Sequence, residues 1–166
     1  MKYWLFSFFI LVLTGCHRDG WHHSLIQNGN ATYDMAKLIH KASSPSSGMD
    51  LEFSRRGSMI HGYINVHAFE LPSFDGDLYA TTLTIETDLA TKTFVIPLLE
   101  GGQRARLTDD CLEYLLQTLE LKPHVTLSSG YFKEEVNSSR FVLHMDALQR
   151  SNSRIRPQHM INFELY

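Results

Sequence analysis

Hydrophobic residues recur at two spacings along this chain, and the spacing changes near residue 50. Between residues 32 and 42, Met35, Leu38, Ile39 and Ala42 follow the helical spacing, which predicts a short amphipathic helix over 32–42. From Asp50 onward the apolar positions alternate, and alternation predicts half-buried strands. The expected strands are 59–69, 77–87, 93–99, 125–131, 140–145 and 160–166.

One later segment, residues 108–122, carries a strong helical pattern. Thr108 is suited to the N-cap position, and Asp109 and Asp110 would lie in the first turn, where the helix dipole favours negative charge. Pro123 cannot continue the helix. The predicted buried stripe of this helix comprises Cys111, Leu112, Leu115, Leu116 and Leu119.

Strands outnumber helices in this pattern, and the two do not alternate as they do around a parallel sheet. The sequence therefore predicts an α+β fold that is mainly antiparallel β. We expect a sandwich-like sheet with one packed helix at 108–122 and a short N-terminal helix at 32–42. Pro97 suggests that strand 93–99 lies at a sheet edge or contains a bulge.

The first residues of the chain form a different kind of segment. Lys2 gives a positive end, and residues 3–13 are almost all apolar. This run is shorter than the roughly 20 apolar residues that a membrane-spanning helix needs, and it is typical of a secretory signal peptide. The residues that end it, Leu13-Thr14-Gly15-Cys16, resemble the lipobox of bacterial lipoproteins.

The resemblance implies a domain organisation and a location. Residues 1–15 would be a signal peptide removed before Cys16, residues 16–31 a lipidated tether, and residues 32–166 a single globular β-rich domain. Fatty acyl chains such as palmitate on Cys16 would anchor the protein, because two or more chains give stable membrane attachment. His17, rather than an aspartate, follows the cysteine, which favours the outer over the inner membrane of the bacterial envelope.

Charge and cysteine content narrow the function classes. The chain has 15 basic and 18 acidic residues and a formal net charge of −3, so no basic excess draws it to nucleic acid. Its two cysteines are Cys16 and Cys111. If Cys16 is lipidated, Cys111 has no partner for an intrachain disulfide. On an apolar helix face it is expected to behave as a small buried hydrophobe.

Histidines provide one candidate for chemistry. His61, Tyr63 and His67 share one face of a predicted strand. Strand residues six apart are separated by about 20 Å, so His61 and His67 cannot bind one metal ion. A metal site would need another converging ligand, such as His144 or His124. The solvated outer face of a half-buried sheet explains the pattern more simply, and we predict no metal and no cofactor.

The segment 101–106 is the second candidate. Its glycines, together with Arg104 and Arg106, precede the predicted helix N-terminus, and such a combination can bind an anion. The simpler alternative is a strand-to-helix turn whose arginines pair with neighbouring carboxylates, namely Glu100, Asp109 or Asp110. The candidate binding residues are therefore His61, Tyr63, Arg104 and Arg106.

The sequence contains no G-x-S-x-G, H-E-x-x-H, phosphate-binding or dinucleotide-binding signature. We expect a non-enzymatic, membrane-anchored envelope lipoprotein that binds or scaffolds a protein partner. The alternative is a periplasmic ligand-binding or sensing lipoprotein that uses the 101–106 loop, and an enzyme whose site forms only by spatial convergence is a third. A deep polar pocket would favour the ligand, whereas an exposed apolar patch or an unpaired edge strand would favour the partner.

Overall fold

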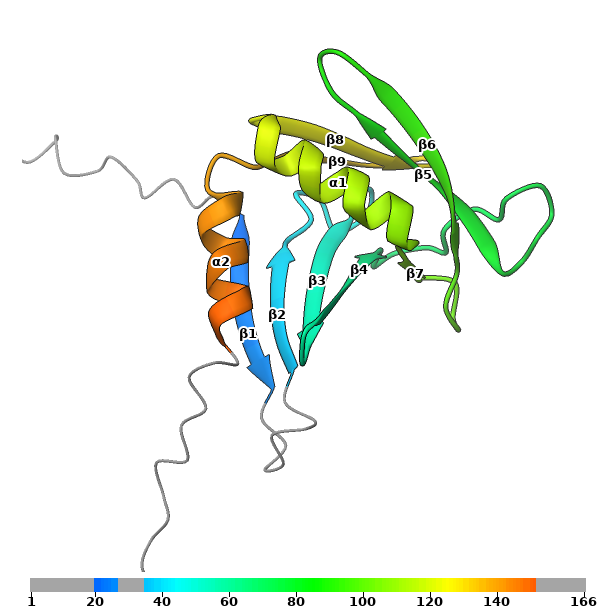
Figure 1. Cartoon of the computed structure of the whole chain (residues 1–166). Coiled ribbons are helices and arrows are strands. Elements are labelled where there is room, and N and C mark those ends of the chain that lie inside the picture. The colour runs from blue at the N-terminus through cyan, green and yellow to red at the C-terminus, as the bar shows by residue number, and fades with distance from the viewer. Residues whose placement is uncertain (1–19, 27–34, 152–166) are drawn as a thin grey trace, which may run out of the picture.

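The computed structural model describes residues 20–26 and 35–151, which form two antiparallel sheets and two helices (Figure 1). The five-stranded sheet has the order β1-β2-β3-β4-β7, and the four-stranded sheet has the order β6-β5-β8-β9. The strands of the first are β1 Trp21–Ile26, β2 Met35–His40, β3 Asp50–Arg56, β4 Met59–Asn65 and β7 Arg104–Arg106. Those of the second are β5 Ala80–Glu86, β6 Thr91–Pro97, β8 His124–Ser129 and β9 Phe132–Asn137. The helices are α1 Asp109–Leu121 and α2 Phe141–Ser151.

The predicted fold class is confirmed. All strand pairs within the two sheets are antiparallel in the described chain. Strands β4, β5, β6 and β8 correspond to predicted strands, and β6, which contains Pro97, lies at a sheet edge as expected. None of the expected strands lies at the position of β3, β7 or β9.

The two sheets are joined at one corner and share one core. Leu98, just after β6, bridges to Ala105 of β7, and the Leu99 amide donates to the Arg104 carbonyl at 2.8 Å. Figure 1 shows the sheets meeting at a steep angle, with α1 across them and α2 in front of β1. Buried side chains from both sheets and both helices form a single hydrophobic cluster.

The close approach of α1 to the five-stranded sheet requires a glycine. A Cβ at position 62 would lie 2.6 Å from Leu107 Cδ1 and 3.0 Å from Leu112 Cδ1. Gly62 lies in β4 opposite Phe53, on the side of the sheet that faces the core. The missing side chain therefore lets the start of α1 pack directly on the sheet.

The predicted helix over 32–42 is wrong, because residues 35–40 form strand β2. Ala36, Leu38 and His40 alternate inward and are buried, while β1 and β3 pair on either side. Ile39 points to the opposite face, in the middle of the sheet, where it is half-buried. Neighbouring apolar residues on the two faces of a central strand reproduce a helical spacing over so short a segment.

The expected tether over 16–31 is also wrong for residues 21–26, which form strand β1. Trp21 is buried, and its ring packs against Phe53 and Phe141 at centroid distances of 6.2 and 5.2 Å. A single aromatic residue in a polar segment thus fixes that segment to the core. The predicted signal peptide, Cys16 and the predicted strand 160–166 lie outside the described residues.

The predicted strand 140–145 is helix α2. Its buried side chains, Phe141, Met145 and Leu148, follow the helical spacing, and the last of them lies beyond the predicted strand. Arg55 of β3 donates to the Leu148 carbonyl at 3.2 Å and to the Gln149 carbonyl. A cation at the C-terminal turn satisfies carbonyls that have no partner within the helix.

The predicted helix 108–122 is confirmed as α1, with Thr108 at the N-cap position. The Thr108 hydroxyl does not cap the backbone but donates to the Asp110 carboxylate. Leu116 is only partly buried, and Thr118 takes the remaining buried position, where its hydroxyl donates to the Tyr114 carbonyl at 2.7 Å. Neither α1 nor α2, the helices of the described chain, has the length and hydropathy needed to cross a membrane.

Candidate functional site

The structure brings the four predicted binding residues together on one face of the five-stranded sheet. Strand β7 pairs with β4, so Tyr63 lies opposite Arg106 and Asn65 lies opposite Arg104. His61 and Tyr63 alternate with core residues along β4, and both arginines alternate with buried Ala105 along β7. The predicted 101–106 loop is therefore wrong at its end, because Arg104 and Arg106 belong to a strand.

The two arginines contact different side chains of β4. The Arg104 guanidinium carbon lies 4.1 Å from the centroid of the Tyr63 ring, in a cation–π arrangement. Arg106 Nη2 lies 3.2 Å from His61 Nδ1. Since arginine can only donate, His61 accepts this hydrogen bond through an unprotonated nitrogen.

Arg104 forms its ion pair with Glu52 of β3, and not with Glu100, Asp109 or Asp110. Arg104 Nη2 lies 3.1 Å from Glu52 Oε1, and Lys37 Nζ of β2 lies 2.9 Å from the same oxygen. The Glu52 side chain is buried although it points away from the core. One cation from the neighbouring strand β2 and one from β7, on the far side of β4, thus cover one carboxylate and replace the water that it loses.

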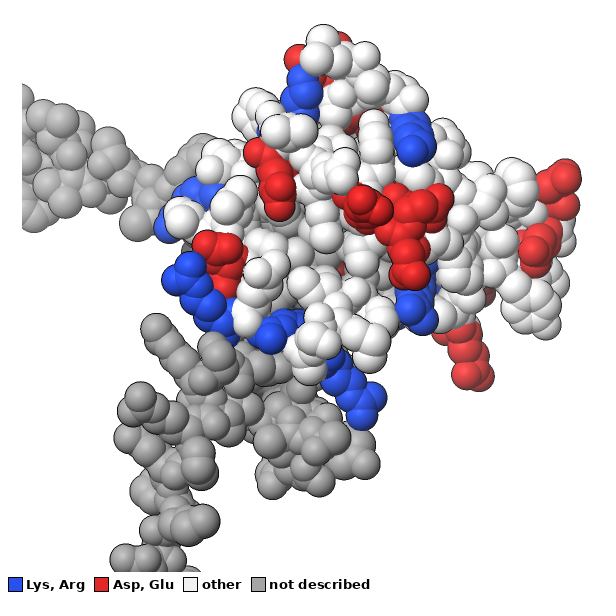
Figure 2. Space-filling view, in the orientation of Figure 1, with Lys and Arg blue, Asp and Glu red and all other residues white. Residues whose placement is uncertain are grey.

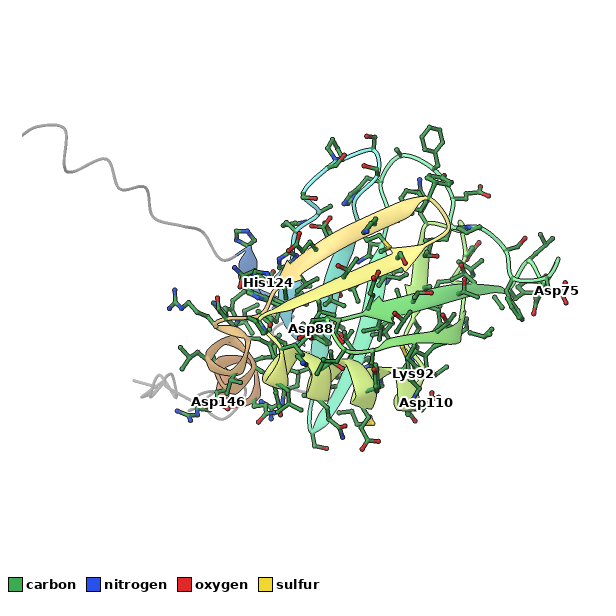
Figure 3. The ribbon with its side chains drawn as sticks, turned by 90° about the horizontal axis from the view of Figure 1, so that it is seen from above. Asp75, Asp88, Lys92, Asp110, His124 and Asp146 are labelled. Atoms are coloured by element: carbon green, nitrogen blue, oxygen red, sulfur yellow. The ribbon has the colours of Figure 1, made fainter. Side chains whose placement is uncertain are left out.

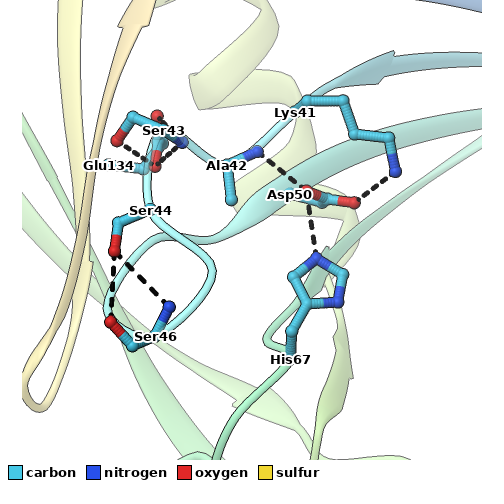
Figure 4. Close-up of polar contacts among 8 residues, drawn as sticks. All are labelled: Lys41, Ala42, Ser43, Ser44, Ser46, Asp50, His67 and Glu134. Atoms are coloured by element: carbon cyan, nitrogen blue, oxygen red, sulfur yellow. Dashed lines mark hydrogen bonds and ion pairs between the residues drawn. The ribbon is translucent and has the colours of Figure 1, made fainter.

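Asp50, two residues before Glu52, repeats this arrangement at the start of β3 (Figure 4). Its carboxylate accepts from the Ala42 amide at 2.8 Å and from Lys41 Nζ at 2.9 Å, and His67 Nε2 lies 3.2 Å away. Burial by itself would raise the pKa of Asp50. The Ala42 amide, Lys41 and His67 more than offset this effect, and they hold the pKa below its ordinary value of 3.8.

This side of the sheet carries an excess of positive charge. We call it the basic face, and it comprises the outward-pointing residues of β2, β3, β4 and β7 with their immediate ends. Against Asp50 and Glu52, its basic residues are Lys37, Lys41, Arg56, Arg104 and Arg106. Figure 2 shows the other side of the molecule, where acidic side chains lie along α1. The exposed acids of α1 are Asp109, Asp110, Glu113 and Glu120.

Across the described ranges, 20–26 and 35–151, no carboxylate balances the charge of Arg106. Asp50 and Glu52 are occupied by Lys41, Lys37 and Arg104, whereas the contact of Arg106 is the uncharged nitrogen of His61. Arg106 is also exposed. This guanidinium is thus available to an anionic group that approaches the face of the sheet over β4 and β7.

Two hollows in the described part of the surface lie away from these residues. One of about 420 Å³ is lined by residues of β5 and β8 and the turns beside them, among them Glu86, Asp88 and His124. A smaller one of about 190 Å³ lies between the β5–β6 turn and the end of α1. Neither includes any of the four predicted residues, and the basic face has the open shape of a sheet surface.

The histidines proposed as further metal ligands do not converge on His61. His124 Nδ1 lies 3.4 Å from Glu135 Oε1, and His144 Nδ1 lies 3.0 Å from His23 Nε2. Within residues 20–26 and 35–151, no group of three or more histidine, cysteine or acidic side chains is placed to hold a metal ion.

The thiol of Cys111 is buried in α1, as predicted. Burial raises its pKa to about 12, with a smaller contribution from neighbouring Asp110. The thiol is therefore protonated at neutral pH, and its environment is that of a core side chain and not of a nucleophile.

Sequence reasoning did not identify the edge strand β1 or the buried carboxylates of β3. In the described chain, β1 pairs only with β2, and its residues after Trp21 are exposed, including Leu25 and Ile26. Trp21 was the available signal for β1. No local signal marks Glu52, because its partners come from strands that are distant in sequence.

Comparisons with known proteins supply no relative for this arrangement. No family model matches the chain, and neither the curated proteins nor the solved structures contain a match.

Proposed function

We propose that this protein is a non-enzymatic lipoprotein of the bacterial envelope, anchored through acyl chains on Cys16. Its globular domain binds an acidic segment of a protein partner through the basic face. One observation carries the proposal: the Arg106 guanidinium beside His61 is exposed and has no carboxylate partner in the part of the chain that the structure describes. It lies on a basic face of a protein whose net charge is negative. The lipobox-like residues that end at Cys16 support the anchoring.

The geometry favours a macromolecular partner over a small ligand. The ligand-binding alternative depended on a 101–106 loop around an anion, but both arginines lie in a strand on an open sheet surface. Small ligands are normally held in concave pockets, and neither described hollow reaches these residues. An open charged sheet face next to an exposed edge strand suits an extended acidic segment of a protein.

Site-specific photocrosslinking in the full-length, membrane-attached protein tests this function. A crosslinking residue at position 61 should capture a partner through an acidic segment, whereas one at Gln117 on α1 should not. Arg106→Glu should reduce capture from position 61 by at least tenfold. Lys133→Glu, which reverses an exposed charge on β9, is the matched control and should leave capture unchanged.

Two results would overturn the proposed site. Capture from position 61 could be insensitive to Arg106→Glu, or capture could depend equally on Lys133. The anchor is tested separately, because Cys16→Ser should abolish labelling by a radioactive fatty acid and release the protein from membranes. Continued labelling of Cys16→Ser protein would show that Cys16 does not carry the lipid.

A further inference from the structure

The described fold begins very close to the proposed lipid attachment. Gly20 is four residues after Cys16, and its carbonyl accepts from the Lys41 amide at 3.3 Å. The next residue, Trp21, is buried, and its indole nitrogen donates to the Asn137 carbonyl at 2.9 Å. Four residues span at most about 14 Å whatever path they follow. If Cys16 is lipidated, the part of the domain around Gly20 is held near the bilayer.

Three elements meet at this part of the molecule, which we call the anchor end. It comprises Gly20 with the start of β1, the last turn of α1 through Pro123, and the first turn of α2. The Ser138 amide donates to the Pro123 carbonyl at 3.0 Å, and the Ser138 hydroxyl donates to the Lys122 carbonyl. Figure 3 shows His124, just beyond Pro123, at the opposite end of the molecule from Asp75.

The anchor end exposes large apolar side chains. Leu121 in the last turn of α1 is 80% exposed, and Val142 and Leu143 in the first turn of α2 are also exposed. Leu89, from the β5–β6 turn, lines the same hollow as Leu121. Lys122 beside them pairs with Asp88 at 2.9 Å. The surface thus combines apolar side chains with a lysine whose charge is paired, a composition suited to the interfacial region of phospholipid.

We propose that the anchor end rests on the bilayer, with Leu121, Leu89, Val142 and Leu143 directed into its interface. This inference depends on the proposed lipidation of Cys16. The acyl chains confine the domain to the membrane, and the short connection allows only this end to reach it, so weak apolar contacts act at high effective concentration. The loop that contains Asp75 then points away from the membrane, and the basic face stands to the side, open to a partner.

Lipid-proximity quenching in the acylated full-length protein tests this orientation. Leu121→Cys and Leu78→Cys place single labels at opposite ends, because Leu78 lies in the turn beyond Asp75 and is 77% exposed. Cys111 is buried and does not compete for the fluorophore. In vesicles of phosphatidylethanolamine and phosphatidylglycerol that contain spin-labelled lipid, we expect quenching at position 121 to exceed that at position 78 at least threefold.

Each outcome decides a different claim. Equal quenching at the two positions, or stronger quenching at position 78, would overturn the orientation while leaving the acylated anchor intact. Fatty-acid labelling of the same preparations reports the anchor independently. Absence of label on Cys16 would overturn the proposed lipidation and the orientation together.

Discussion

On strand β3, Leu51 and Phe53 point into the core while Asp50 and Glu52 point to the basic face, and none of the four is more than 5% exposed. The apolar pair is buried within the hydrophobic cluster, where the Phe53 ring packs against Trp21 of β1 and Phe141 of α2. The acidic pair is buried by long basic side chains that lie across it. The two pairs are therefore equally buried for different reasons. On the core face, apolar side chains exclude water, whereas on the basic face hydrogen-bond donors replace the water around the carboxylates.

The comparison explains why the basic face is both structural and available for binding. Each buried carboxylate needs donors, so Lys37, Lys41 and Arg104 are held in place by the fold. Arg106 pairs with no carboxylate among the described residues, and it is the side chain to which the proposed function assigns recognition. A binding variant at Arg106 should therefore leave the fold intact, whereas variants of the carboxylates and their cations should affect stability.

The largest expected effect is on the apolar face of β3. Phe53→Ala removes a fully buried ring that packs on Trp21 and Phe141, leaving a cavity where β1, β3 and α2 meet. We expect a loss of about 3–5 kcal/mol in the free energy of unfolding, measured by urea denaturation. Tyr79→Ala, at an exposed site, should change the midpoint little. Similar losses for the two variants would contradict the assigned core.

An intermediate effect is expected on the basic face. Glu52→Ala removes the shared acceptor of Lys37 and Arg104 and should destabilise by about 1–3 kcal/mol, because hydrogen bonds with charged partners are lost and two cations are left together. Glu100→Ala, at an exposed turn, should cost far less. A double-mutant cycle should show coupling of Arg104 to Glu52 but not to Glu100. Coupling of Arg104 to Glu100 instead would support the alternative in which Arg104 pairs with Glu100 in a strand-to-helix turn.

The smallest effect is a dependence of stability on pH. Because the folded pKa of Asp50 lies below its ordinary value of 3.8, ionised Asp50 stabilises the fold above about pH 4. This contribution is lost as the pH falls through 3.8 toward the folded pKa. The difference in unfolding free energy between the wild type and Asp50→Asn should be constant near neutrality and shrink in acid. If the difference in unfolding free energy did not change with pH, ionised Asp50 would not stabilise the basic face as described.

The elements that the sequence predicted well depend on local patterns. Helix α1 combines an N-terminal threonine, early acids and a regular apolar stripe within one segment. Strand β2 and helix α2 were predicted wrongly because their short segments are ambiguous until their neighbours are known. Trp21 holds β1 against the core by packing on Phe53 and Phe141, and no local pattern in the sequence reveals these contacts.

The candidate site divides in the same way. The sequence shows that His61 and Tyr63 alternate with apolar residues and that Arg104 and Arg106 are separated by one residue. This spacing alone predicts that each pair points to one side of its segment. That these positions share a face was decided by the pairing of β4 with β7.

The sequence by itself determined the antiparallel α+β class, helix α1, the buried Cys111 and the identity of the polar candidates. These follow from residue type and short-range periodicity, which act over a few positions along the chain. Only the tertiary structure decided that β3 buries carboxylates on its outward face. It also decided that Arg104 forms an ion pair with Glu52, whereas Arg106 is exposed. The physical reason is that Arg104 and Glu52 are 52 residues apart, and their contact forms only when the sheet sets β3, β4 and β7 side by side.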